Sequence, residues 1–210
     1  YTPFEWHKEL FYYAKKNNIT LFSTPFDESA VDLLESLNVP AYKVSSFELI
    51  DLPLIKYIAK KKKPILMSTG MASLDEIREA IETAKVHGCN NIVIFHCISG
   101  YPTPVEQANL CGIKLLKREF DVQVGLSDHT LGILTSIVGV SLGASVIEKH
   151  FTLSRSKGGL DCSFSLEPQE MTNLVKDTSN AHLSLGNNNS LRSKVEETSS
   201  TFRRSLYFVK

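Results

Sequence analysis

Six short apolar runs recur along the chain, each followed by a stretch with the spacing of an amphipathic helix. Short runs of nearly continuous apolar residues are typical of parallel strands that are covered on both faces. Their starts recur every ~20–30 residues, as expected where a crossover helix joins parallel neighbours. The runs are ITLFST (19–24), AYKVSS (41–46), PILMST (64–69), NIVIFHC (91–97), VQVGLS (122–127) and SVIEKHF (145–151). This rhythm predicts an α/β fold built on a parallel sheet.

Helical patterns fill the intervals between the runs. The clearest begins at Ser73, a residue type favoured at helix N-caps, and Glu76 completes a capping box with it. Gly88 then supplies a stop signal. Helices are likewise expected over residues 2–18, 27–38, 51–62, 109–120 and 130–144.

Two architectures fit such a series, a (β/α)8 TIM barrel and a doubly wound open sheet. No GxGxxG motif follows any run, and polar residues collect where every run ends. Both observations favour the barrel. Residues 1–185 are therefore predicted to form a partial TIM barrel with about six of the eight βα units. The chain opens with a predicted helix that carries Pro3 near its start, so two N-terminal units are expected to be missing.

After about residue 185 the composition changes. The segment GNNNSLRSKVEETSSTFRRSLYFVK is rich in asparagine and serine and ends in basic and aromatic residues. Such a composition is typical of a linker. Residues 186–210 are therefore predicted to be a linker toward a C-terminal domain that this sequence lacks.

The charge balance argues against polyanionic partners. The chain has 23 Lys plus Arg and 23 Asp plus Glu, so no long-range field favours nucleic acid or an anionic membrane. No stretch approaches the ~18 uninterrupted apolar residues of a membrane span. The 4 cysteines form no CxxC pair and lack the density of a disulfide scaffold, which indicates reduced thiols. A cytoplasmic protein is expected.

The strand ends carry the candidate site, because the chemistry of a TIM barrel gathers at the C-terminal ends of its strands. Lys43 lies within an otherwise apolar run, and a buried ammonium group needs an anionic partner. Hydroxyl donors come from other strand ends: Thr24, Ser46, Ser68 and Ser127. Together they predict a pocket for a phosphate or carboxylate group. The alternative is that Lys43 pairs with Glu48 or another acid at the strand ends for structure alone.

Two of the runs are followed or ended by histidines that are expected to lie close together. His129 and His150 belong to neighbouring predicted strands. Neutral imidazoles placed in this way can share a divalent metal and leave positions open for substrate or water. The alternative is a pair of hydrogen-bonded core histidines. His96 precedes the last residue of its run and is expected to point the other way, so it is not counted as a ligand.

The same motifs, in the same order, resemble those of the sialic acid synthase family. The matching blocks are FSTPFD, YKVSSFE, LMSTGMASLDEI, HCISGYPTP, VGLSDHTLG, LGASVIEKHFTL and SLEP. The resemblance implies condensation of phosphoenolpyruvate with an N-acetylated hexose. It also implies a TIM barrel followed by a small antifreeze-like domain, which reaches over the partner subunit's active site in a homodimer.

Within that family, TPFEWHKELF, SSFE and GGLDCSFSLEP resemble the pseudaminic acid synthases more than the N-acetylneuraminate synthases. Leu160 stands where the neuraminate enzymes usually have proline, and Ser99 where they usually have asparagine. The expected sugar is thus a 2,4-diacetamido-2,4,6-trideoxyhexose of the altrose type, and the expected products are pseudaminic acid and phosphate. The alternative is an N-acetylneuraminate or legionaminic acid synthase that uses a sugar of the N-acetylmannosamine type.

The resemblance also implies a role for each candidate residue. His129 and His150 would hold a divalent metal, Mn²⁺ or Mg²⁺, that polarises the open-chain aldehyde of the sugar. The phosphate and carboxylate of phosphoenolpyruvate would be held by Thr24, Lys43, Ser46, Ser68 and Ser127. Glu48 and Tyr101 would face the sugar, although a loop tyrosine can equally pack on the barrel end.

Two other readings remain open at this point. Lys43 could form a Schiff base, as barrel-strand lysines do in class I aldolases. The chain could instead be an inactive, truncated barrel, because the first two strands of the family carry a catalytic glutamate and a further phosphate-binding lysine.

Overall fold

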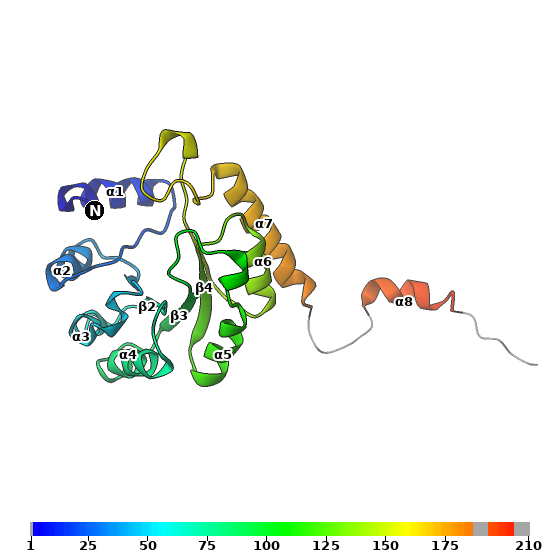
Figure 1. The fold of residues 1–210 in the computed structure, drawn as a ribbon, viewed down its shortest axis with the longest axis horizontal. Helices are drawn as coiled ribbons and strands as arrows, with labels where there is room; N and C mark the ends of the chain where they lie inside the picture. Colours follow the sequence, from blue (N-terminus) through cyan, green and yellow to red (C-terminus); the bar gives the residue numbers. More distant parts are fainter. Residues whose placement is uncertain (1, 187–192, 204–210) are drawn as a thin grey trace, which may run out of the picture.

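The computed structural model describes residues 2–186 and 193–203. Five parallel strands form one sheet in the order β1-β2-β3-β4-β5, which is also their order in the chain. They are β1 (Tyr42–Val44), β2 (Ile65–Ser68), β3 (Ile92–Cys97), β4 (Gln123–Asp128) and β5 (Ile147–Lys149). The predicted incomplete barrel is confirmed, because the curved sheet forms about half of a barrel with helices on its outer side (Figure 1).

The helices that alternate with these strands lie where the sequence predicts them. They are α1 (Phe4–Lys16), α2 (Glu28–Ser36), α3 (Leu52–Ala59), α4 (Leu74–Val86), α5 (Cys111–Glu119) and α6 (Leu134–Ser141), followed by α7 (Pro168–Ser184) and α8 (Lys194–Ser200). The predicted capping box at the start of α4 is present, because Ser73 and Glu76 each accept from the other's backbone N–H. Helix α8 falls inside the predicted linker and buries none of its residues. Residues 187–192 and 204–210 of that linker lie outside the described chain.

The first predicted strand is the exception. Residues 19–24 are extended but make only one bridge, between Ser23 and Tyr42 of β1. In the described part of the chain this segment has β1 as its single sheet neighbour, and β1 is only 3 residues long. Ile19 is 60% exposed. A run with one short neighbour cannot form the ladder that its apolar composition predicts.

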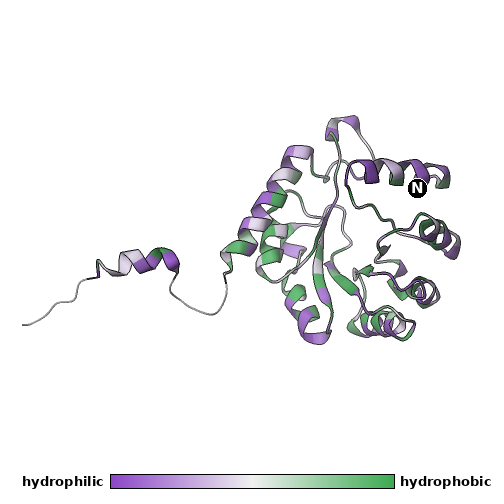
Figure 2. Cartoon of the chain, turned by 180° about the vertical axis from the view of Figure 1, so that it is seen from behind, coloured by the Kyte–Doolittle hydropathy of each residue, from purple (hydrophilic) through white to green (hydrophobic). Residues whose placement is uncertain are grey.

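The hydrophobic core lies between the sheet and the helices that cover it. Ile65 and Met67 of β2 are fully buried, as are Ile55 and Ile58 of α3. Burial of such a side chain stabilises the fold by about 1.5–3 kcal/mol. Hydrophobic residues turn toward the sheet and hydrophilic ones toward the outer surface of the helices (Figure 2). The inner face of the sheet, away from the helices, is therefore free to carry polar side chains.

No helix within the described residues is both long enough and apolar enough to cross a membrane.

Candidate active site

Two histidines meet at the C-terminal end of the sheet. His129 directly follows β4 and His150 directly follows β5, and their ring centroids lie 5.2 Å apart. The ring of Tyr101, from the loop after β3, lies 4.4 Å from that of His129 and 6.1 Å from that of His150. The structure thus brings together three residues that the sequence assigns to the sugar and metal side of the site.

The outer contacts of the two imidazoles determine which ring nitrogens are available. His129 Nδ1 lies 3.0 Å from the carbonyl oxygen of Ile98. A carbonyl only accepts, so Nδ1 carries the proton of the neutral ring and Nε2 keeps its lone pair. His150 Nδ1 lies 3.6 Å from Asp161 Oδ2, which favours the same tautomer. Two nitrogen donors suit a divalent ion that takes its other ligands from water or substrate.

The described residues contain no group of three or more His, Cys, Asp or Glu side chains arranged to hold an ion. Burial and the neighbouring His129 both lower the pKa of His150, which keeps this ring neutral near pH 7.

His129 has a second neighbour, Cys97, at the end of β3. Its Sγ lies 3.9 Å from His129 Nδ1 and 3.6 Å from Ser46 Oγ. Burial raises the pKa of the Cys97 thiol, but its contacts with His129 and Ser46 outweigh burial and lower the pKa overall. For His129, burial alone would lower the pKa. The contacts with Cys97 and the Ile98 carbonyl raise it by more, so the net pKa is raised.

Lys43 anchors a second group of side chains on the same face of the sheet. Its Nζ donates to Ser68 Oγ at 2.8 Å and lies 3.4 Å from Glu148 Oε2. Ser127 Oγ donates to Glu148 Oε1 at 2.7 Å. We call these four residues (Lys43, Ser68, Ser127 and Glu148) the anion cluster. The acid that pairs with Lys43 is thus Glu148, from β5, and an incoming anion would compete with it.

Next to the anion cluster, several hydroxyl groups surround Gly70. The Gly70 N–H donates to Ser46 Oγ at 3.0 Å. Ser99 Oγ is buried and has no hydrogen-bond partner among the residues that the structure describes. A Cβ atom at position 70 would lie 2.3 Å from Ser99 Oγ and 2.8 Å from Ser46 Oγ, so only glycine leaves room here. An unpartnered buried hydroxyl is costly unless a ligand completes it, which fits an anion at this place.

Two predicted site residues do not join either group. Thr24 borders a separate hollow beside α1 and α2, together with Phe22 and Phe26. Glu48 begins a short 3-10 helix (Glu48–Ile50) and accepts a hydrogen bond from the hydroxyl of Ser45. Among the described contacts, none links Thr24 or Glu48 to Lys43 or to the histidines. His96 points away from the site as expected, with Nε2 2.9 Å from the Ala108 carbonyl oxygen.

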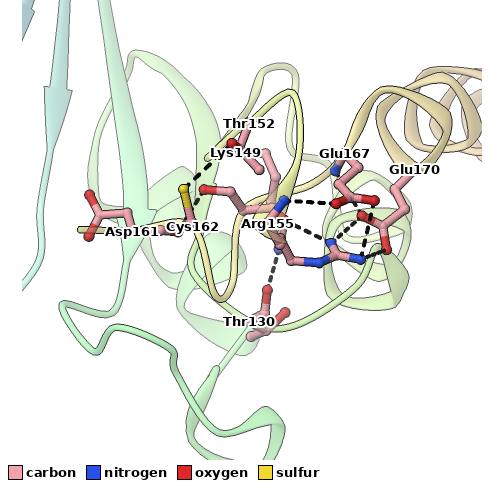
Figure 3. Close-up of polar contacts among 9 residues, drawn as sticks. Thr130, Lys149, Thr152, Arg155, Asp161, Cys162, Glu167 and Glu170 are labelled. Carbon is pink, nitrogen blue, oxygen red and sulfur yellow. Dashed lines mark hydrogen bonds and ion pairs between the residues drawn. The ribbon is translucent and has the colours of Figure 1, made fainter. Parts of the chain in front are cut away.

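A loop after β5 covers the His150 side of the site. Phe164 is buried in this loop, with its ring 5.0 Å from His150 and 5.9 Å from Tyr101. Arg155 ties the loop to the start of α7: its guanidinium donates to the Ser165 carbonyl at 3.0 Å and makes two hydrogen bonds to Glu170 (Figure 3). The Arg155 backbone N–H donates to Glu167 at 2.8 Å. The loop is thus fixed at its base while Asp161 and Phe164 face the imidazoles.

Residues 1–190 match the model of the NeuB family. The chain belongs to this family. The predicted resemblance to sialic acid synthases is therefore confirmed, and the match covers all of the site residues described above.

Similar proteins in this family carry several different names. The chain is 41% identical to the pseudaminic acid synthase of Helicobacter pylori over 210 residues, which is 100% of the chain and 62% of that protein. It is 45% identical to the N,N'-diacetyllegionaminic acid synthase of Campylobacter jejuni, over 91% of the chain and 58% of that protein. It is also 48% identical to an uncharacterized Methanocaldococcus jannaschii protein, over 80% of the chain and 50% of that protein. The chain spans about half to three fifths of the length of these NeuB family relatives.

A solved structure agrees with the fold. The N-acetylneuraminic acid synthetase of Leptospira borgpetersenii, in complex with citrate, superposes with a TM-score of 0.91 at 31% identity. The match covers 98% of this chain and 72% of that one. A DAHP synthase of Thermotoga maritima shares the fold with a TM-score of 0.75 at 16% identity.

Three residues of the site have no role assigned from the sequence. Glu148 stands one residue before Lys149 in the EKH motif, and strand alternation would have placed it on the same face as His150. Cys97 ends its run, and a single cysteine outside a disulfide or metal motif gives no sequence signal for a place in the site. Asp161 lies 11 positions after His150 in a loop, and no local pattern predicts that the loop folds back.

Proposed function

We propose that the protein condenses phosphoenolpyruvate with an N-acetylated amino sugar to form a nonulosonic acid and phosphate. The observation that carries this proposal is the juxtaposition of the paired imidazoles and the anion cluster at one end of the sheet. Membership of the NeuB family supports it, because its named relatives include pseudaminic acid and legionaminic acid synthases. The proposal includes a soluble, cytoplasmic homodimer.

Phosphoenolpyruvate would bind over the anion cluster. Lys43 neutralises the phosphate, and the hydroxyls of Ser46, Ser68 and Ser127 donate to its oxygens or to the carboxylate. The unpartnered hydroxyl of Ser99 adds a donor that the sequence did not predict as part of the site. Thr24 remains part of this proposal, and would need to approach from its position beside the first helices.

The sugar would lie over the imidazoles. His129 and His150 would hold Mn²⁺ or Mg²⁺, and such an ion when bound polarises the aldehyde carbonyl. Tyr101 would line the same space through its ring, and Glu48 would face the sugar from the loop after β1. Phe164 restricts access of water from the loop side.

The chemistry follows from this placement. C3 of phosphoenolpyruvate supplies the electron pair for the new bond to the aldehyde carbon, and the carbonyl oxygen takes the displaced pair and a proton. Positive charge develops at C2, where water adds and loses a proton. The bond from C2 to the phosphate oxygen then breaks, phosphate leaves with the electron pair, and the C2 hydroxyl loses its proton to become the keto group. Lys43 and Ser127 exchange Glu148 for the anion when phosphoenolpyruvate binds. These donors would then already face the phosphate and carboxylate when the charges change, so little reorganisation would accompany the chemical steps.

Among the possible sugars, we propose the 2,4-diacetamido-2,4,6-trideoxyhexose of the altrose type, which gives pseudaminic acid. The motifs around Ser99 and Leu160 support this choice over N-acetylmannosamine. The chain is about equally identical to a pseudaminic acid synthase and to a legionaminic acid synthase. The alternative substrate is therefore a sugar of the N-acetylmannosamine type. A direct comparison of both sugars with the full-length protein tests it, and preferential use of N-acetylmannosamine would reverse the choice.

The reaction class is tested with the full-length protein and its His129→Ala and His150→Ala variants. Each variant should lose Mn²⁺ binding and at least about a hundredfold in condensation rate, because one imidazole cannot replace the pair. Unchanged Mn²⁺ affinity would remove the pair as ligands. Borohydride trapping with pyruvate checks the Schiff-base reading, in which a covalent adduct would form at Lys43; no adduct is expected.

A further inference from the structure

A buried ion pair joins β4 to β5, one residue before the two imidazoles. Lys149 Nζ lies 3.0 Å from Asp128 Oδ2, and the side chains are only 2% and 0% exposed. Asp128 and Lys149 are register partners in the sheet, and each immediately precedes one of the histidines. The pair therefore links the two strands at the last residues before the histidines.

Every charged atom of this pair is already satisfied by the protein. Asp128 Oδ1 accepts from the backbone N–H and the hydroxyl of Thr130, both at 2.8 Å, and Oδ2 accepts from Ser136 Oγ of α6 at 2.6 Å. Lys149 Nζ also donates to the Thr130 carbonyl (Figure 3). Both carboxylate oxygens have two partners each and both side chains are buried, so the pair is closed to a substrate.

The pair lies on the opposite face of the sheet from the anion cluster. Successive residues of a strand point to opposite faces, so Ser127 and His129 share one face while Asp128 points to the other. The contact of Asp128 with Ser136 places the pair on the side covered by α6. Ser127 and Glu148 are likewise register partners, and their hydrogen bond lies on the inner face.

Stability alone does not account for a buried pair at this position. Desolvation of two charges offsets much of their attraction, and apolar residues of similar volume are often equally stable there. An apolar pair would pack in more than one alignment, whereas a carboxylate and an ammonium must face each other. A slip of one residue would also turn every side chain of β5 to the other face.

We propose that the Asp128–Lys149 pair fixes the register of β5 against β4 and so positions His129 and His150 as a facing pair. The two residues are positioning residues that act through the imidazoles. The inference deepens the proposed function, since it assigns the structural origin of the two-nitrogen site. The inference rests on the proposed function only where Mn²⁺ affinity is measured.

The test uses the full-length protein carrying Asp128→Leu together with Lys149→Met, which replaces the pair by apolar side chains. Lys61→Met is the control, because Lys61 forms an exposed pair with Asp32 far from the imidazoles in sequence. We expect the double variant to fold and to bind Mn²⁺ about tenfold or more weakly. The control should leave the Mn²⁺ affinity unchanged.

A crystal structure of the double variant gives a readout that does not depend on metal. We expect the imidazole rings to leave their 5.2 Å arrangement. Retention of that arrangement, or of wild-type Mn²⁺ affinity, would overturn the inference. If the unaltered protein binds no Mn²⁺, the metal of the proposed function is refuted. The positions of the two rings in the double variant then still test whether the ion pair places them.

Asp128→Asn provides a second variant that keeps the volume and one acceptor oxygen. It should fold and show a smaller loss of Mn²⁺ affinity than the double variant. If neither variant folds, the pair is a requirement of the whole sheet, and a specific role in positioning the imidazoles is refuted.

Discussion

Glu148 and Lys149 are neighbours in β5, and each belongs to an ion pair, but the two pairs differ in every physical respect. The Lys149–Asp128 pair is almost completely buried, and each oxygen of its carboxylate has two partners. The Lys43–Glu148 pair is longer, at 3.4 Å, and the Glu148 side chain is 39% exposed. A closed pair can only hold structure, whereas an open pair can exchange one partner for a ligand. Under the proposed function, adjacent residues divide structural and binding roles between the two faces of one strand.

The largest effect should come from breaking the closed pair on one side only. Lys149→Met leaves the Asp128 carboxylate buried without its cation, which should lower the free energy of unfolding by about 3–5 kcal/mol. Chemical denaturation of the full-length protein measures this loss. The double variant with Asp128→Leu should recover most of it, and a single variant as stable as the unaltered protein would show that the pair is not buried as described.

Breaking the open pair should affect binding more than folding. In Lys43→Met, Glu148 can turn to water, so the free energy of unfolding should fall by about 1 kcal/mol or less. The KM for phosphoenolpyruvate should rise at least about tenfold, while the KM for the sugar changes little. Steady-state kinetics with each substrate varied in turn makes the comparison. Equal increases for both substrates would contradict the assignment of Lys43 to the anion pocket.

A third pair, between Arg155 and Glu170, is exposed and belongs to a loop. Arg155→Gln should leave the denaturation midpoint nearly unchanged, because exposed pairs contribute little. It should loosen the loop that carries Asp161 and Phe164, with faster proteolysis there and a KM for the sugar raised by a few fold. Arg118→Gln, at another exposed arginine next to a glutamate, is the matched control. Identical behaviour of both variants would show that Arg155 does not hold the loop.

The smallest effect concerns pH. The hydrogen bond from Arg155, supported by the backbone N–H of Glu167, lowers the pKa of Glu170 below its ordinary 4.5. A carboxyl group with a lowered pKa in the folded state stabilises the fold above 4.5, and this contribution disappears as the pH falls through the folded pKa. Glu170→Gln should therefore flatten part of the decline in melting temperature below that pH. An unchanged slope would remove Glu170 from the acid response.

The sequence predicts those parts of the site that depend on strand periodicity. Most strand ends could be located from their apolar runs, and the shared C-terminal end of parallel strands places Lys43, Ser68, Ser127 and the histidines together. Partners across strands required the register, which no single run contains. For this reason the sequence leaves the acid beside Lys43 open between Glu48 and other acids at the strand ends. In the structure this acid is Glu148, from β5.

Other parts could not be predicted for a different reason. The segment from Ile19 has the composition of a strand, but sheet formation also depends on neighbours, and here β1 alone pairs with it through one bridge. The approach of Asp161 to His150 depends on a loop held by Arg155, whose partners lie on α7. Such contacts depend on tertiary folding rather than on local patterns.

Gly70 has a consequence for how this pocket could evolve resistance to an inhibitor. The hydroxyls of Ser46 and Ser99 lie so close to this position that an alanine methyl group would stand 2.8 Å and 2.3 Å from their oxygens. Alanine at position 70 would therefore push both hydroxyls aside. An escape mutation at this position would weaken the natural anion together with any synthetic phosphonate that copies it.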